Sequence, residues 1–217
     1  MTERPGGEQI ASRATAARWL ALAVVAFDVV DIRLGTGYSG PLLTLAGLVA
    51  VLCLNDGDHP SVGMRFAPIQ GWWYWSRLAL WFGFWIGIVL AVLAGVLTLL
   101  GQTIQFYSTE PTFGAFFRMC VYAPFEEEIV YRLLLTVALA PTLGQRGTIF
   151  VSGSVFALIH ILGGNPSPEN QIAGFLLEWA YLRSGTILVP IAMHSVGNLI
   201  ALGSQFAGWY WLAYAAV

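Results

Sequence analysis

The feature that most constrains this fold is a series of apolar runs long enough to cross a membrane. Of 217 residues, 57% are hydrophobic and only 10% are charged, whereas a soluble domain carries about 25% charged residues. A membrane-spanning helix takes about 20 mostly apolar residues. The candidate spans are residues 14–33, 40–55, 75–101, 112–140, 147–163, 171–181, 186–205 and 206–217. The sequence therefore predicts an all-α, polytopic transmembrane bundle of about eight helices, or six to seven if the short runs do not cross.

The distribution of basic residues predicts how the bundle is oriented. All ten basic residues are arginine. If the N-terminus is cytoplasmic, one arginine falls outside, two lie within spans, and seven fall on the cytoplasmic side: Arg4, Arg13, Arg18, Arg65, Arg77, Arg146 and Arg183. Such asymmetry is typical of the positive-inside bias, so both termini are predicted to be cytoplasmic. The formal net charge of −2 and the lack of a basic run exclude a nucleic-acid partner.

The chain is predicted to form one integral membrane domain. Residues 1–111 supply N-terminal membrane helices and a polar, proline-containing interfacial loop, residues 112–205 supply the core helices, and residues 206–217 form a short C-terminal helix. Asp28 and Asp31 lie in the first span and are expected to face the bundle interior or the membrane surface.

Few polar side chains remain deep in the predicted helices once loop charges are set aside. Ionisable residues within a membrane are functional candidates, because a lone charge in hydrocarbon costs several kcal/mol. The set comprises Glu126, Glu127, Glu128 and Arg132 in one span, His160 in the next, Glu178 in a third, and His194 and Asn198 in a fourth.

The spacing of these residues divides them into pairs. Glu128 and Arg132 are four residues apart, so they share a helix face and can neutralise each other. Glu127 lies about 100° around the helix from Glu128 and therefore points elsewhere. Phe156 and His160 are also four residues apart, as are His194 and Asn198. We expect Glu127, His160 and His194, each on its own helix, to converge at similar depth.

A glutamate and two histidines in a cavity of low polarity suit hydrolysis by an activated water molecule. The carboxylate can take a proton from water, and an imidazole can share that task. The second histidine and an asparagine amide can donate hydrogen bonds to the oxyanion that forms on the attacked carbonyl. No serine lies in a nucleophile motif. A proton or ion pathway in a transporter remains the alternative on spacing alone.

Three motifs in this chain resemble those of a known family. The stretch EEIVYR (Glu127–Arg132) matches E-E-x-x-x-R, FALIH (Phe156–His160) matches F-x-x-x-H, and HSVGN (His194–Asn198) matches H-x-x-x-N. In this order and spacing, they are similar to the signatures of the CPBP intramembrane proteases, the CAAX-protease and bacteriocin-processing family also called Abi. The resemblance covers about residues 113–203.

The resemblance implies a role for each motif residue. Glu127 is implied to be the principal base that activates water, with His160 assisting it. His194 and Asn198 are implied to form the oxyanion site. The remaining motif residues are implied to support the site: Glu128 and Arg132 as a structural pair, and Phe156 packed behind His160.

Two features of the site are left open by this resemblance. Glu126 is not assigned by the motif and is expected to line the cavity or to stay protonated. A mechanism without a cofactor is favoured, and zinc held by Glu127, His160 and His194 is the alternative, although the H-E-x-x-H helix of soluble zinc proteases is absent.

The resemblance also implies what the protein acts on. The expected partner is a membrane-anchored or membrane-associated peptide or protein within the lipid bilayer, with prenylated C-termini, peptide leaders and C-terminal sorting tails as candidates. The lysine-free composition favours a bacterial inner membrane. A membrane scaffold that cleaves nothing is the non-enzymatic alternative.

Overall fold

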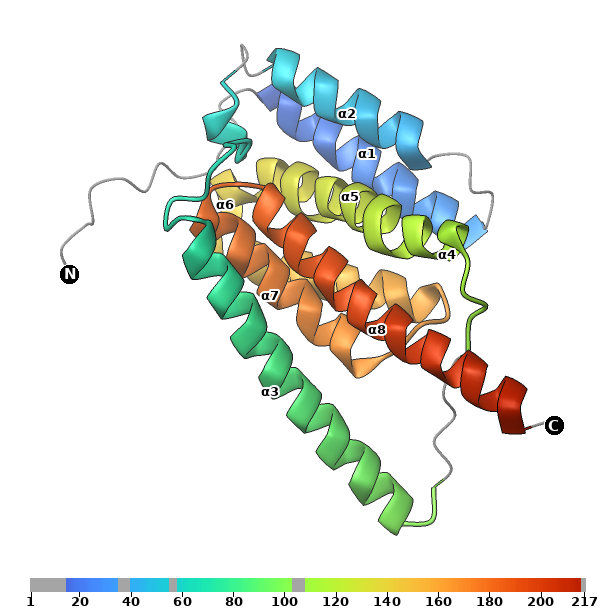
Figure 1. Cartoon of the computed structure of the whole chain (residues 1–217). Coiled ribbons are helices and arrows are strands. Elements are labelled where there is room, and N and C mark those ends of the chain that lie inside the picture. The colour runs from blue at the N-terminus through green and yellow to red at the C-terminus, as the bar shows by residue number, and fades with distance from the viewer. Residues whose placement is uncertain (1–14, 35–39, 55–57, 103–107, 216–217) are drawn as a thin grey trace. The chain divides into compact units, whose positions relative to one another are not determined.

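The described part of the chain is helical almost throughout. The computed structural model describes residues 15–34, 40–54, 58–102 and 108–215 (Figure 1). Within these residues, the only β-structure is an isolated bridge between Met64 and Thr186. The helices are α1 (Thr15–Leu34), α2 (Gly40–Leu54), η1 (Pro60–Val62), α3 (Trp72–Leu99), α4 (Phe113–Phe117), η2 (Arg118–Tyr122), α5 (Ala123–Glu128), η3 (Ile129–Leu134), α6 (Leu135–Leu162), α7 (Pro168–Ser184) and α8 (Leu188–Ala215). The predicted all-α class is confirmed.

Two stretches of helix are long and apolar enough to cross a membrane, Trp72–Leu99 and Phe113–Leu162. The second covers 50 residues, which in a straight helix would measure about 75 Å, more than twice the hydrocarbon thickness of a bilayer. It does not run straight, because Gly144 has the non-helical angles φ 64° and ψ 177°.

Contacts across the break at Gly144 show that the chain reverses there. The Ser152 hydroxyl donates a 2.7 Å hydrogen bond to the Tyr131 carbonyl, and Glu127 lies 3.9 Å from His160. In a straight helix, Glu127 and His160 would be about 50 Å apart. Pro141 and Gly144 therefore form the corner of a helical hairpin, as predicted by the break between residues 140 and 147.

The C-terminal segment differs from the sequence-based expectation. Two segments were predicted, at 186–205 and 206–217, and the second was expected to be a short separate helix. Instead, Leu188–Ala215 forms one continuous helix, α8. Gly203 and Gly208 do not interrupt it, because glycine only weakens a helix, and no proline follows Pro190 to remove a backbone hydrogen bond.

The helix that carries the first motif contains two wide turns. Residues Arg118–Tyr122 and Ile129–Leu134 are π-helical and flank α5 on either side. The first wide turn has a local cause, because Pro124 lacks the N–H that an α-helical turn would use. The Ala123 N–H accordingly bonds to the Arg118 carbonyl, five residues back.

The chain forms two compact units. One comprises residues 1–69 and 125–191, and the other comprises residues 70–124 and 192–217. In the first unit, the hairpin packs against α1, α2 and α7 around buried apolar side chains, among them Val51, Leu134 and Phe156. The predicted division at residues 111 and 205 remains a prediction.

The aspartates of the first predicted span face the interior of this unit. Asp28 and Asp31 are each only 8% exposed, and the Tyr131 hydroxyl donates a hydrogen bond to Asp28. This contact joins α1 to the helix that carries the first motif.

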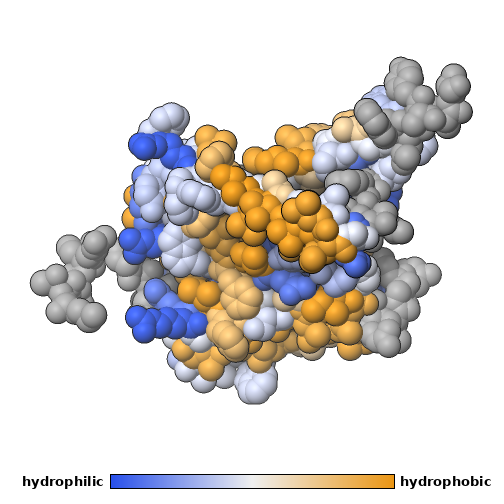
Figure 2. All heavy atoms as spheres, turned by 90° about the horizontal axis from the view of Figure 1, so that it is seen from below, coloured by the Kyte–Doolittle hydropathy of each residue, from blue (hydrophilic) through white to orange (hydrophobic). Residues whose placement is uncertain are grey.

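In the second unit, α3 presents large apolar side chains along its whole length. Trp73, Leu80, Phe84, Val92 and Leu99 are each more than half exposed. The face of the molecule seen in Figure 2 has broad apolar areas. Exposed apolar area of this extent marks a surface that meets lipid or another apolar partner, which agrees with an integral membrane protein.

Reporter fusions test the predicted orientation. A fusion at Gly144, the corner of the hairpin, is expected to report the cytoplasm, and a fusion at Pro166, after α6, the opposite side. The reason is that the helix between them, about 18 residues, is long enough to cross. The same compartment for both would show that this arm of the hairpin does not span the bilayer.

Candidate active site

The first two motifs meet within the hairpin. The Glu127 carboxylate, at the end of α5, lies with its Oε2 atom 3.9 Å from Nε2 of His160, on the last turns of α6. The Glu127 side chain is 27% exposed and that of His160 is 15% exposed. Both side chains are therefore partly exposed, although the Glu127 Oε2 atom that faces His160 is itself buried.

The hydrogen bond on the other ring nitrogen of His160 orients the imidazole. Nδ1 lies 3.0 Å from the Phe156 carbonyl oxygen, one turn earlier on the same helix. A carbonyl can only accept, so Nδ1 carries the hydrogen. In the neutral ring, Nε2 is then a lone-pair acceptor that points toward Glu127.

Phe156 packs between the first motif and the second. Its ring is 1% exposed and lies 4.3 Å, centroid to centroid, from the His160 ring. The guanidinium carbon of Arg132 lies 4.3 Å from the same Phe156 centroid. Phe156 therefore supports the imidazole on one side and the cation on the other, in agreement with its implied place behind His160.

The pair predicted between Glu128 and Arg132 is present and sealed from solvent. Arg132 Nε lies 3.0 Å from Glu128 Oε2, and both side chains are 0% exposed. Adjacent glutamates therefore occupy different environments, because Glu127 is partly open while Glu128 is enclosed with its counter-charge. Glu126, which the motif leaves unassigned, is half-buried.

The structure adds three residues that the motifs do not contain. Thr136 donates a 2.6 Å hydrogen bond to Glu178 on α7, Ser152 lies 2.8 Å from the same carboxyl, and all three are 0% exposed. The sequence spacing indicated that Thr136 and Ser152 share a helix face with motif residues. Glu128, Arg132 and Thr136 follow one another at four-residue spacing, as do Ser152, Phe156 and His160.

The third motif, His194–Asn198, lies on the part of α8 that belongs to the second unit. The Asn198 side-chain amide donates a 2.7 Å hydrogen bond to the Met119 carbonyl. That carbonyl lies in the π-turn, where Ala123 bonds to Arg118 instead and Pro124 has no N–H to offer. Pro124 thus frees a backbone carbonyl that Asn198 binds, and a second amide hydrogen remains on Asn198. His194 is half-buried.

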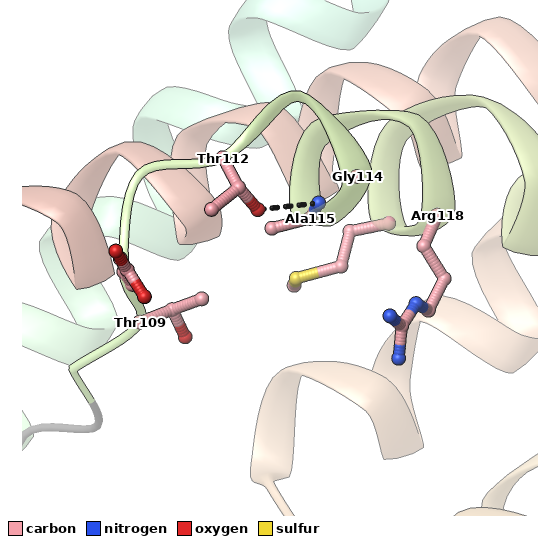
Figure 3. A pocket seen from close by; sticks show the side chains of 7 residues that line it. Thr109, Thr112, Gly114, Ala115 and Arg118 are labelled. Atoms are coloured by element: carbon pink, nitrogen blue, oxygen red, sulfur yellow. Dashed lines mark hydrogen bonds between the residues drawn. The ribbon is translucent and has the colours of Figure 1, made fainter.

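A cavity lies next to the residue that Asn198 binds. It has a volume of about 330 Å³ and is lined by Thr109, Glu110, Thr112, Gly114, Ala115, Arg118 and Met119. In Figure 3, the Thr112 hydroxyl caps the start of α4 by accepting from the Ala115 N–H, and the Arg118 side chain extends away from the helix. Thr109 also joins this wall to α8 by donating a 2.6 Å hydrogen bond to Gln205.

Zinc held by Glu127, His160 and His194 is the alternative to a mechanism without a cofactor. Catalytic zinc takes three protein ligands and a water molecule. Among the described residues, no group of three or more His, Cys, Asp or Glu side chains is placed to hold a metal ion. Glu127 and His160 lie in the first unit and His194 lies in the second, so the zinc alternative stays a prediction and the mechanism below uses no metal.

Comparison with known proteins gave one match. The family model described as type II CAAX prenyl endopeptidase Rce1-like matches residues 109–200. This stretch contains all three motifs, the cavity and Glu178. Neither the curated proteins nor the solved structures gave a match.

Proposed function

We propose that this chain is an intramembrane protease, because its residues 109–200 match the family model described as type II CAAX prenyl endopeptidase Rce1-like. It cleaves a peptide bond near the membrane end of its substrate with a water molecule activated by Glu127 and His160. The observation that carries this proposal is the Glu127–His160 contact. The two groups face each other across 3.9 Å and both side chains are partly exposed, which suits a water molecule bound at the edge of the pair that both can contact.

In the proposed reaction, Glu127 takes a proton from this water while the water oxygen attacks the substrate carbonyl carbon. His160 accepts a hydrogen bond from the same water through Nε2. The carbonyl oxygen becomes an oxyanion, which His194 and the second amide hydrogen of Asn198 stabilise. When the C–N bond breaks, the proton held by Glu127 passes to the departing amine, which regenerates the carboxylate and leaves a new carboxyl terminus.

The neighbouring pair, Glu128 and Arg132, takes no part in proton transfer in this proposal. Its side chains are closed to solvent, so water does not reach them. Their role is to hold the motif helix so that Glu127 points toward His160.

The substrate is proposed to be a membrane-anchored protein or peptide of a bacterial inner membrane. The cavity beside Met119 supports this choice, because it offers room for a peptide segment within the unit that contains Asn198. Its wall contains Glu110 and the exposed cation Arg118, and Arg118 can bind a carboxylate of the substrate.

Metal removal tests the mechanism directly. Purified protein in liposomes, mixed with membrane-anchored reporter peptides, is expected to keep at least about half of its cleavage rate after chelation and dialysis, because a carboxylate base needs no metal. Mass spectrometry of the products measures the rate and the cleavage site. Stoichiometric zinc whose removal abolishes cleavage would contradict the metal-free mechanism and make Glu127, His160 and His194 its ligands.

The same liposomes distinguish a protease from the other classes of membrane protein. Proton or solute flux without any cleavage would indicate a transporter, and neither flux nor cleavage of any reporter would indicate a scaffold.

A further inference from the structure

A buried carboxyl outside the three motifs joins the helices that carry two of them. Glu178 on α7 is 0% exposed. One of its oxygens, Oε1, accepts a 2.6 Å hydrogen bond from Thr136, and the other, Oε2, lies 2.8 Å from Ser152 Oγ. Glu178 thus contacts both arms of the hairpin from a third helix.

The contacts of Ser152 decide where the hydrogens lie. Ser152 Oγ is 2.7 Å from the Tyr131 carbonyl, 2.8 Å from Glu178 Oε2 and 3.4 Å from Arg132 Nη1. The serine hydroxyl has one hydrogen, the carbonyl can only accept, and the guanidinium can only donate. The one serine hydrogen therefore lies in the hydrogen bond to the Tyr131 carbonyl. The short contact between Ser152 Oγ and Glu178 Oε2 then needs a second hydrogen, which Glu178 has to supply.

We propose that Glu178 is a neutral carboxylic acid that donates its hydrogen to Ser152 and thereby positions Arg132. With this assignment, Thr136 donates to Glu178, Glu178 donates to Ser152, Ser152 donates to Tyr131, and Arg132 donates to Ser152. Every short contact in the cluster then has one hydrogen.

The charges of the cluster support the same assignment. The charged and titratable groups that face Glu178 are Arg132 and Glu128 from the motif helix and Tyr181 from α7 itself. The single cation is already paired with Glu128. A second carboxylate would give this enclosed cluster a net negative charge, which is costly without water, whereas a neutral Glu178 leaves it balanced.

The consequence for the site runs through Arg132. Glu178 and Ser152 hold the guanidinium against the Phe156 ring, and that ring in turn supports His160. Glu178 is therefore a positioning residue, since it touches no reacting group. Its expected effect on cleavage rests on the proposed function, but its effect on stability does not.

Substitution by glutamine tests the protonation state. Glutamine has the shape of the neutral acid, and its amide can donate to Ser152 and accept from Thr136. Glu178→Gln is expected to melt within about 2 °C of the parent and to cleave within about threefold of it at pH 7. Glu178→Leu fills the space without hydrogen bonds and is expected to melt about 5–10 °C lower. Glu169→Gln, at an exposed position at the start of the same helix, is the matched control.

The pH dependence distinguishes positioning from simple packing. A carboxyl that is protonated when folded and ionised when unfolded makes the folded state lose stability as the pH rises. The parent is therefore expected to lose thermal stability relative to Glu178→Gln as the pH rises above about 4.3, where a free glutamate ionises. Its cleavage rate is expected to fall relative to Glu178→Gln at the higher pH where the folded protein releases this proton. The infrared spectrum of the parent is expected to contain a protonated-carboxyl band that Glu178→Gln lacks.

An ionised Glu178 would overturn the proposal. In that case, Glu178→Gln would be strongly destabilised at pH 7, its difference from the parent would shrink as the pH falls, and the infrared band would be absent from the parent. If the parent cleaves nothing, the melting and infrared measurements still decide the state of Glu178, and only the proposed protease mechanism fails.

Discussion

Replacing Glu127 with glutamine is expected to abolish cleavage while the protein still folds. The amide has nearly the same shape as the carboxylate but cannot accept a proton from water. Loss of a general base costs about 10²- to 10⁴-fold in rate, so turnover is expected to fall by at least that amount. Because the Glu127 side chain is partly exposed, the loss of its charge is expected to change the melting temperature little.

The neighbouring glutamate provides the control for this experiment. Glu126 is also half-buried, one residue away on the same helix, and Glu126→Gln removes the same charge without removing the proposed base. Single-turnover cleavage of a membrane-anchored reporter in liposomes, together with binding of the uncleaved reporter, measures both variants. Cleavage by Glu127→Gln at a rate near the parental one would assign the base to another group.

The oxyanion residue is expected to show a smaller loss. His194→Ala removes one hydrogen-bond donor from the proposed oxyanion site, and one such donor is worth about 10²- to 10³-fold in kcat. A loss for His194→Ala as large as that for Glu127→Gln, accompanied by loss of bound zinc, would instead favour the metal alternative.

The helices and the first motif were predictable because local rules decide them. Long apolar runs predict α3 and the arms of the hairpin, and the break between residues 140 and 147 predicts the corner between them. Four-residue spacing on one helix predicts the pair Glu128–Arg132 without any tertiary information. The structure confirms each of these features.

The partners of the motif residues were harder to predict, because they come from distant parts of the chain. Glu178 lies 42 residues from Thr136 and 26 residues from Ser152. Small hydroxyl residues are common in apolar helices, where they pack closely or bond to their own backbone. Their sequence context alone does not show that they surround a carboxyl.

The hydrogen bond of Asn198 could not be predicted from the sequence for a different reason. Its acceptor is the backbone carbonyl of Met119, and a backbone group leaves no mark in the side-chain pattern. Pro124 was the one local clue, since a proline within a helix frees a carbonyl about one turn earlier. Which side chain then binds that carbonyl depends on tertiary structure.

Replacing Arg132 with alanine is expected to cause the largest loss of stability. Arg132 and Glu128 are both closed to solvent, so alanine leaves the carboxylate buried without its counter-charge. Breaking a buried pair in this way costs about 3–5 kcal/mol. The substitution also removes the group that stacks on Phe156 and donates to Ser152. Thermal melting in detergent and the yield of folded protein measure the effect.

The double substitution Glu128→Gln with Arg132→Met shows whether the uncompensated charge is the cause. It removes both charges and keeps similar side-chain volume, so it is expected to melt above Arg132→Ala although it changes one more residue. Arg146→Ala, at an exposed position near the hairpin corner, is the control and is expected to melt like the parent. Unchanged melting of Arg132→Ala would mean that water reaches the pair and that Glu127 is held in place by other contacts. If the double variant melts no higher than Arg132→Ala, the loss comes from the stacking and hydrogen bonds of the guanidinium and not from its charge.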